Sequence, residues 1–294
     1  MTRIGRFKSP RHSRLYFAAY GKAMSRCPEP AEEIDVETRH GTTRVYRFGV
    51  GDAPPLVLLP SLMGTSACYG PLLSALSEHR RVYAVDTLGE AGRSVQTAPF
   101  ADVADRARCL DDVLARLDLT GVHLMGGSTG GWHAFNQAVH APDRIASISA
   151  LDPTTVVTGF SWPVTTFGAV AAVLNQDRMW RRFLRWSAGA DIADRADVQL
   201  ILAGIRTYTP RVPFQVPPGD DAIRSITVPV LALFGGRSVV HDSAVAASRL
   251  RALRPGADVE ILPGAGHYLF MLPQHREQIV ARVLDFIHRH DRER

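Results

Sequence analysis

The chain has 294 residues, enough for one large domain that buries a full core without disulfides or metals. Its composition, 46% hydrophobic and 21% charged, is close to the globular average and excludes collagen-like, disordered and coiled-coil proteins. The net charge of +5 arises from seven basic residues that precede the first acidic residue, Glu29; without them the net charge is −2. The folded body therefore lacks the charge excess of a nucleic-acid-binding protein.

The number of cysteines and the length of the apolar segments indicate in which cellular compartment the protein is expected. Cys27, Cys68 and Cys109 are an odd number at wide spacings, which favours neither a disulfide framework nor a zinc ribbon. The apolar run Leu15–Tyr20 is too short for a signal peptide, and the uncharged stretch Pro153–Gln176 is interrupted by polar residues, glycine and proline. We therefore expect a cytoplasmic protein with no integral membrane segment.

The predicted elements begin with a basic arm, residues 1–30, that contains a short amphipathic helix around Ser13 to Met24. Two β-rich segments flank the turn signal His40-Gly41 and predict a hairpin. Short apolar runs then alternate with helical periodicity. The predicted strands are Glu33–Arg39, Thr42–Phe48, Leu56–Leu59, Arg81–Val85, Val122–Met125, Ile145–Leu151, Val228–Phe234 and Val259–Leu262. The predicted helices are Ala101–Leu117, Thr129–Val139, Ser243–Leu253 and His275–Ile287.

This alternation predicts an α/β fold with a mostly parallel central sheet and helices on both faces. One interval, residues 153–222, contains no clear strand–helix unit; it has an apolar start, an arginine-rich helix at Met179–Ser187 and a proline-rich end. An insertion of this length on the carboxyl side of the sheet is typical of a cap or lid over a pocket. We therefore divide the chain into the arm, a core of residues 31–152 and 223–294, and this cap.

The strongest catalytic signal is Val122–Trp132, where an apolar strand passes through Gly-x-Ser-x-Gly into a helix. A nucleophile at so sharp a turn has a strained backbone, and bulky neighbours would collide with the adjacent strand and helix, hence Gly126 and Gly130. The turn places Ser128 at a helix N-terminus, where free N–H groups favour developing negative charge. The alternative is a glycine-rich connection with an incidental serine, but the strand and helix context favours Ser128 as a nucleophile.

A serine nucleophile needs a base. The candidate is His267, which ends the sequence Leu262-Pro263-Gly264-Ala265-Gly266-His267 directly after the last predicted strand. The small preceding residues allow a loop to carry the imidazole across the top of the sheet. Histidines in a predicted strand, in the helix after Ser128 or in the charged terminal helix are more often structural or solvated.

With these features, residues 30–290 resemble the α/β-hydrolase superfamily, in particular its capped, esterase-like serine hydrolases. Asp86–Ser94 is similar to the DxxGxGxS loop of that family, with a one-residue variation, and Pro60–Gly64 lies where the family has its HGxxG oxyanion loop. The resemblance implies an oxyanion hole formed by the backbone N–H groups of Leu62 and Thr129. Because the donor is main chain, Leu62 supplies it even though Pro60-Ser61 replaces the usual His-Gly.

The triad acid is the second departure from the family. Its common position, in a loop after the strand Val228–Phe234, holds Ser238 here. Asp152 ends the preceding predicted strand, a second site from which members of the superfamily supply the acid, although Asp-Pro at a strand end is also an ordinary turn. Asp242 is a third candidate that equally fits a helix N-cap. The sequence favours Asp152 and leaves Asp242, or no acid at all, open.

The resemblance implies hydrolysis of an apolar ester, thioester or lactone through an acyl-enzyme on Ser128, with no cofactor and no metal. A small apolar substrate is the expected partner, because the predicted cap carries Phe160, Trp162, Phe167 and Trp180; a homodimer stays open. The alternatives are a cofactor-free perhydrolase, a C–C hydrolase or a biosynthetic cyclase or lyase on the same fold, and a non-catalytic ligand-binding protein.

Overall fold

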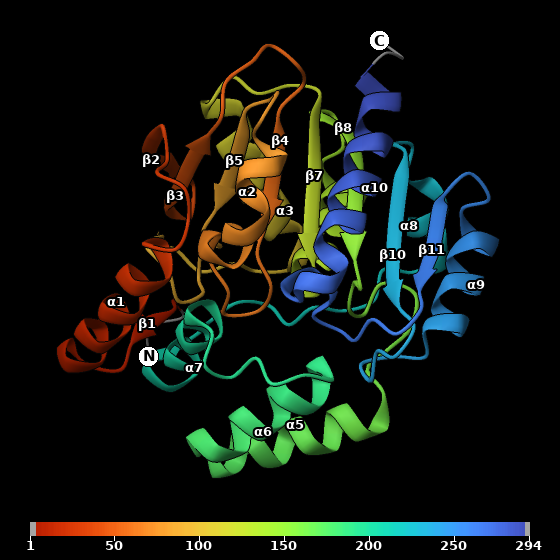
Figure 1. The fold of residues 1–294 in the computed structure, drawn as a ribbon. Helices are drawn as coiled ribbons and strands as arrows, with labels where there is room; N and C mark the ends of the chain where they lie inside the picture. The colour runs from red at the N-terminus through yellow and green to blue at the C-terminus, as the bar shows by residue number, and fades with distance from the viewer. Residues whose placement is uncertain (1–3, 292–294) are drawn as a thin grey trace.

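The structure, a computed structural model, describes residues 4–291; residues 1–3 of the predicted arm and 292–294 of the predicted core lie outside it. Within the described part, a nine-stranded sheet has the order β11-β10-β8-β7-β4-β5-β3-β2, with β6 beside β3 (Figure 1). Pairing is parallel from β11 to β5 and antiparallel around β3. The strands are β2 (Glu32–Thr38), β3 (Gly41–Phe48), β4 (Leu56–Leu59), β5 (Val82–Val85), β6 (Val95–Gln96), β7 (Val122–Gly127), β8 (Ile145–Leu151), β10 (Val230–Gly235) and β11 (Asp258–Leu262).

Helices cover both faces of this sheet. On one face the buried core joins α2 and α10 to one set of strand side chains, and on the other it joins α3, α4, α8 and α9 to the alternate set. Figure 1 shows α2 and α10 in front of the sheet and α3 behind it. These helices are α2 (Gly70–Leu76), α3 (Val103–Arg116), α4 (Thr129–His140), α8 (Asp220–Ser225), α9 (Ser243–Leu253) and α10 (Pro273–Asp291). The predicted α/β-hydrolase fold, mostly parallel with helices on both faces, is confirmed.

The central strands are continuous apolar runs because both of their faces are buried. In β4, for example, Leu56 and Leu58 contribute to the core beneath α2 and α10, whereas Val57 and Leu59 contribute to the core on the opposite face. The predicted strands and helices all occur, and their bounds differ from the structure by at most four residues at either end. Short 3₁₀ turns at Ser66–Tyr69 and Leu269–Met271 complete the core.

Three helices that lie at the carboxyl ends of the parallel strands come from one stretch of chain between β8 and β10. They are α5 (Trp162–Leu174), α6 (Asp177–Ala188) and α7 (Ala196–Thr207), and β9 (Tyr208–Thr209) follows them. Figure 1 shows α5 and α6 below the strand ends, with α7 nearer the sheet. The arginine-rich helix predicted at Met179–Ser187 lies within α6, whereas α5 and α7 were not predicted.

The N-terminal segment is attached to this same stretch. Strand β1 (Arg6–Phe7) pairs antiparallel with β9, and α1 (Pro10–Met24) packs against α7. Ser9 caps α1 by accepting a hydrogen bond from the His12 N–H at 3.3 Å, which explains a helix start earlier than the predicted Ser13. The Tyr20 side chain, 2% exposed, donates a hydrogen bond to Asp86 Oδ2 at 2.8 Å. One face of α1 is therefore part of the buried core.

Candidate active site

Strand register brings the catalytic candidates to one edge of the sheet. Gly127 at the end of β7 pairs with Leu151 at the end of β8, so the next residues, Ser128 and Asp152, leave the sheet side by side. Strand β11 pairs with β10 in the same direction, so the loop that follows β11 and carries His267 starts at this edge as well. The parallel sheet alone therefore collects residues from three distant parts of the chain.

Ser128 occupies a strained turn between β7 and α4. Its φ is +55° and its ψ is −120°, a region that residues with a side chain rarely adopt. The two glycines allow the turn to be this tight: a Cβ on Gly126 would lie 2.2 Å from the Gly130 carbonyl, and one on Gly130 would lie 2.0 Å from the Leu59 carbonyl oxygen. The predicted strand, turn and helix around Ser128 are present.

A continuous hydrogen-bonded chain joins three of the predicted site residues. Nε2 of His267 lies 2.9 Å from Ser128 Oγ, and Nδ1 of the same ring lies 2.6 Å from Asp152 Oδ2. The Ser128 residue is 8% exposed and His267 is 4% exposed, while Asp152 is fully buried. In this geometry the ring can accept the serine proton on Nε2 while Nδ1–H donates to the carboxylate.

The Asp152 carboxylate has further partners besides His267. Its Oδ1 accepts from the Gly235 N–H at 2.8 Å and its Oδ2 from the Ser238 hydroxyl at 2.7 Å. His241 places Nε2 3.2 Å from Oδ1. Burial alone would raise the pKa of Asp152, but its interactions with His241 and His267 outweigh burial and hold that pKa below its ordinary value. The group is therefore an anion at neutral pH.

The other acid candidate has a different neighbourhood. Asp242 precedes α9 and its Oδ1 accepts from the N–H groups of Ala244 and Val245, each at 3.0 Å. It is therefore an N-cap, the second of the two interpretations that the sequence allowed. In the described part of the chain the side-chain hydrogen bonds of His267 go to Asp152 and Ser128, and Asp242 is not among its partners.

Sequence reasoning missed two of these supporting groups. Ser238 stands where the family commonly has its acid, and it donates to the acid supplied from the neighbouring strand. Nothing in the sequence context of His241 distinguishes it from an ordinary loop histidine. Both contacts depend on β10 lying beside β8, which the local sequence does not reveal.

The predicted oxyanion donors also lie at this edge. Thr129 is the first residue of α4, so no helical acceptor exists for its N–H. Leu62 lies in a β-turn closed by a 2.8 Å hydrogen bond from the Gly64 N–H to the Ser61 carbonyl. Among residues 4–291, neither the Leu62 nor the Thr129 N–H donates to an acceptor of the protein. Both remain available to a ligand.

Tyr69 supports the turn that carries Ser128. Its hydroxyl donates to the Leu59 carbonyl at 2.7 Å and accepts from the Gly127 N–H at 2.9 Å, so it links the end of β4 to the residue before Ser128. Its ring stacks on Phe270 with centroids 5.4 Å apart. Burial raises the pKa of Tyr69, so the hydroxyl stays protonated and can serve as donor and acceptor together.

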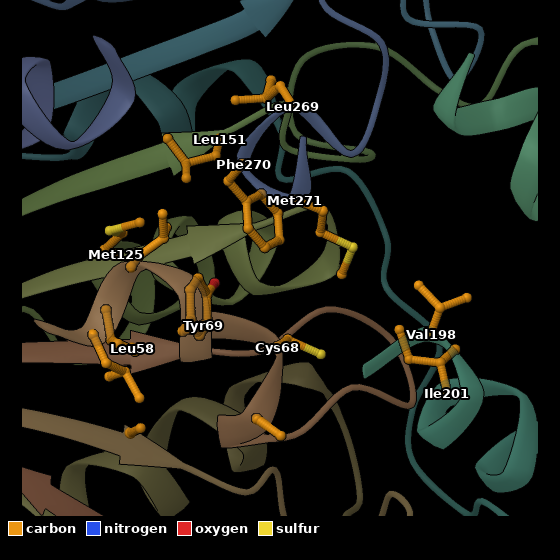
Figure 2. Close-up of a cluster of buried hydrophobic side chains, with 14 of the residues drawn as sticks. Leu58, Cys68, Tyr69, Met125, Leu151, Val198, Ile201, Leu269, Phe270 and Met271 are labelled. Atoms are coloured by element: carbon orange, nitrogen blue, oxygen red, sulfur yellow. The ribbon is translucent and has the colours of Figure 1, made fainter. Parts of the chain in front are cut away.

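Apolar side chains from α7 and from the segment after His267 share a buried cluster with Met63 of the oxyanion loop. Val198 and Ile201 belong to the same buried cluster as Met63, Cys68 and Met271. Figure 2 shows Val198 and Ile201 on α7 at one side of this cluster, with Cys68 and Met271 between them and the sheet.

Two of the aromatic residues predicted to line the pocket, Trp162 and Phe167, lie on α5. Phe167 stacks between α5 and α6, with its ring centroid 5.4 Å from Phe183 and 5.5 Å from Trp186. Trp162, at the start of α5, is 78% exposed, so it is not enclosed in a pocket as the sequence suggested.

Residues 4–291 contain no group of three or more His, Cys, Asp or Glu side chains arranged to hold a metal ion. None of their helices is both long and apolar enough to cross a membrane.

Comparison with known proteins agrees with the geometry. A sequence profile described as "Alpha/beta hydrolase family" matches residues 56–282. The carboxylesterase YbfK of Bacillus subtilis is 32% identical over 280 residues, which cover 92% of this chain and 93% of that protein. The crystal structure of that carboxylesterase, CesB (YbfK), matches with a TM-score of 0.86 at 31% identity, covering 94% of this chain and 98% of that one.

A second solved structure, naproxen esterase (carboxylesterase NP) from Bacillus subtilis, matches with a TM-score of 0.87 at 27% identity, covering 95% of this chain and 99% of that one. The similarity thus spans the region between β8 and β10 as well as the sheet. On the shared fold, the profile match and these relatives, the chain is an enzyme that belongs to the alpha/beta hydrolase family.

Proposed function

We propose that this enzyme is a serine carboxylesterase in which Ser128 is the nucleophile, His267 the base and Asp152 the acid. The observation that carries the proposal is the unbroken chain from Ser128 Oγ through His267 to the buried Asp152 carboxylate, with contacts of 2.9 and 2.6 Å. A buried anion against Nδ1 fixes the tautomer that leaves Nε2 free to accept a proton. Ser238 and His241 would hold that anion in place.

In the proposed reaction, Ser128 Oγ attacks the ester carbonyl while its proton passes to Nε2 of His267. The carbonyl oxygen becomes an oxyanion that accepts from the N–H groups of Leu62 and Thr129. His267 then protonates the leaving alcohol, the C–O bond breaks, and an acyl-enzyme remains on Ser128. Water, deprotonated by His267, attacks that ester; the second tetrahedral intermediate collapses, Ser128 regains its proton, and the acid is released.

The surroundings support an apolar acyl or alcohol group. The buried cluster that contains Met63 next to Leu62 is completed by Val198 and Ile201 from α7. A Cβ added to Gly204 would lie 3.6 Å from the Met63 Cβ, so α7 rests directly on the oxyanion loop. We propose that residues 153–222 act as the cap of the site. The naming of two relatives as carboxylesterases supports an ester, with a thioester or lactone as chemically equivalent substrates.

The test compares hydrolysis of p-nitrophenyl esters of increasing acyl length by the wild type and Ser128→Ala. We expect Ser128→Ala to lower kcat by about 10⁴- to 10⁶-fold, because residual catalysis would rest on binding and the oxyanion hole alone. Ser25→Ala, which removes an exposed hydroxyl after α1, is the matched control and should behave as wild type. Turnover that survives Ser128→Ala within tenfold would overturn the proposed nucleophile. Absence of hydrolysis with every ester would overturn the esterase assignment.

A further inference from the structure

The oxyanion loop contains one residue in a conformation that its side chain disfavours. Met63, in the third position of the turn Ser61–Gly64, has a φ of +54°. Such a conformation persists only where the surroundings impose it. The Met63 N–H donates to Glu90 Oε2 at 2.7 Å, and this bond holds the peptide between Leu62 and Met63 in one of its two orientations. A flipped peptide would direct a carbonyl oxygen at the Glu90 carboxylate.

Glu90 is itself fixed by a buried ion pair. Its Oε1 accepts from Arg106 Nη2 on α3 at 2.9 Å, and the two side chains are 2% and 4% exposed. The other guanidinium amino group, Nη1, donates to the Pro213 carbonyl at 3.2 Å. A carboxylate buried to this extent needs such a partner, and the pair in turn restricts where Glu90 can place its second oxygen. Glu90 is one of the two residues, with Ala91, that stand between Gly89 and Gly92, where the DxxGxGxS pattern has one residue.

The same arginine contacts the helix that begins with the other oxyanion donor. Arg106 Nη2 lies 2.7 Å from Nε2 of His133 on α4, and its guanidinium carbon lies 5.4 Å from the ring centroid of Trp132. Burial and the Arg106 charge hold the pKa of His133 well below its ordinary value, so the neutral ring accepts this hydrogen bond. Trp132 and His133 follow Thr129 by one turn of α4.

We propose that Glu90, clamped by Arg106, is a positioning residue: by fixing the Leu62–Met63 peptide it fixes the turn Ser61–Gly64, so that the preceding Ser61–Leu62 peptide presents its N–H, the Leu62 donor of the oxyanion hole, in register with the Thr129 N–H. This inference rests on the proposed function, because an oxyanion hole matters only to an enzyme that forms a tetrahedral oxyanion. The Glu90 carboxylate does not touch the substrate. In the oxyanion loop Pro60-Ser61 replaces the His-Gly that is common in the family. Glu90 supplies the support that this replacement removes from the loop.

The experiment measures kcat and KM for a p-nitrophenyl ester, together with inhibition by two compounds of the same shape. A trifluoromethyl ketone becomes an oxyanion when a serine adds to it, whereas the corresponding secondary alcohol binds without one. For Glu90→Ala we expect kcat to fall by about 10²- to 10³-fold, the effect of losing one oxyanion donor, with KM nearly unchanged. The ketone should lose affinity by a similar factor and the alcohol should not.

Two further variants separate positioning from folding. Glu90→Gln keeps one oxygen that can accept from the Met63 N–H but turns its NH₂ toward Arg106, so its kcat should lie between those of Glu90→Ala and the wild type. The double variant Glu90→Leu with Arg106→Met removes the charge pair together, so it avoids an unpaired buried charge while it still lacks the acceptor; it should fold and show the same selective loss of ketone affinity. Glu78→Ala, at an exposed carboxylate, is the control and should match the wild type.

The outcomes distinguish this inference from the proposed function. If the wild type hydrolyses the ester through Ser128 and the folded Glu90 variants keep its kcat and its ketone affinity, the positioning role is wrong and the esterase assignment stands. Equal weakening of the ketone and the alcohol would also overturn the positioning role, because it would indicate a general disturbance of the pocket. If the wild type shows no Ser128-dependent hydrolysis, the proposed function fails first.

Discussion

Replacement of Asp152 by asparagine tests its role as the triad acid at atomic level. Each carboxylate oxygen of Asp152 faces donors: Gly235 N–H at 2.8 Å on Oδ1, and the Ser238 hydroxyl at 2.7 Å with His267 Nδ1 at 2.6 Å on Oδ2. An asparagine side chain must therefore point its NH₂ at one of these donors. If the NH₂ faces His267, the ring adopts the tautomer with its proton on Nε2, which cannot accept from Ser128.

If the NH₂ of the substituted side chain is instead rotated toward Gly235, two N–H groups meet and the amide oxygen no longer carries the charge that stabilises an imidazolium. Either orientation removes the function of the acid, so we expect Asp152→Asn to lower kcat by about 10³- to 10⁴-fold, or about 4 to 5.5 kcal/mol of transition-state stabilisation. KM for a p-nitrophenyl ester should change much less, because the substrate does not contact this carboxylate in the proposed mechanism.

Asp242→Asn is the matched control, since asparagine caps helices as well as aspartate does and the α9 cap should persist. Its kcat should stay within about threefold of the wild type. Urea unfolding of both variants checks that they are folded under assay conditions. A large loss of kcat in Asp242→Asn with a near-normal Asp152→Asn would refute the assignment, and so would equal losses in both.

Three further predictions concern the fold that holds the site. Gly130→Ala should abolish activity and lower stability, because its Cβ would lie 2.0 Å from a carbonyl oxygen of β4; a folded variant with wild-type kcat would contradict this. Burial lowers the pKa of His123, which contacts Asp291 at 2.9 Å, to about 4, so the unfolded chain binds a proton between about pH 6.5 and 4 that the native protein does not. The free energy of unfolding should therefore fall as the pH is lowered through this window, by up to about 3 kcal/mol, measured by urea titration, and His123→Gln should flatten the fall; equal slopes would refute it. Tyr20→Phe removes a donor to the buried Asp86 and should cost about 1–3 kcal/mol in the same assay, whereas an unchanged urea midpoint would count against that contact.

Much of the sheet could be predicted because its strands are short apolar runs buried on both faces, as in Leu56–Leu59 and Ile145–Leu151, whose bounds agree with the structure. The helices α5 and α7 could not be predicted, for opposite reasons. Most residues of α7 are buried on every side, so it has no polar face, whereas Val170 and Val173 of α5 are exposed apolar residues that blur its periodicity. Both helices depend on tertiary contacts.

For the site, local sequence was enough to single out Ser128 and His267, because a strained turn and a glycine-rich loop leave local signatures. It was not enough to choose between Asp152 and Asp242, since each aspartate has an ordinary local role as a turn former or a helix cap. The choice depends on which strands are neighbours. The hydrogen bond from Ser238 to Asp152 cannot be predicted for the same reason, because it joins the loop after β10 to the residue after β8.

The central claim is that catalysis proceeds through an acyl group on Ser128, and mass spectrometry of the intact protein tests it most directly. Rapid acid quenching during turnover of a p-nitrophenyl ester should reveal one added acyl mass per chain, and peptide mapping should locate it on Ser128. His267→Ala should prevent its accumulation while the chain stays folded. An acyl group on another residue, or steady ester hydrolysis by a wild type whose adduct never includes Ser128, would contradict the claim.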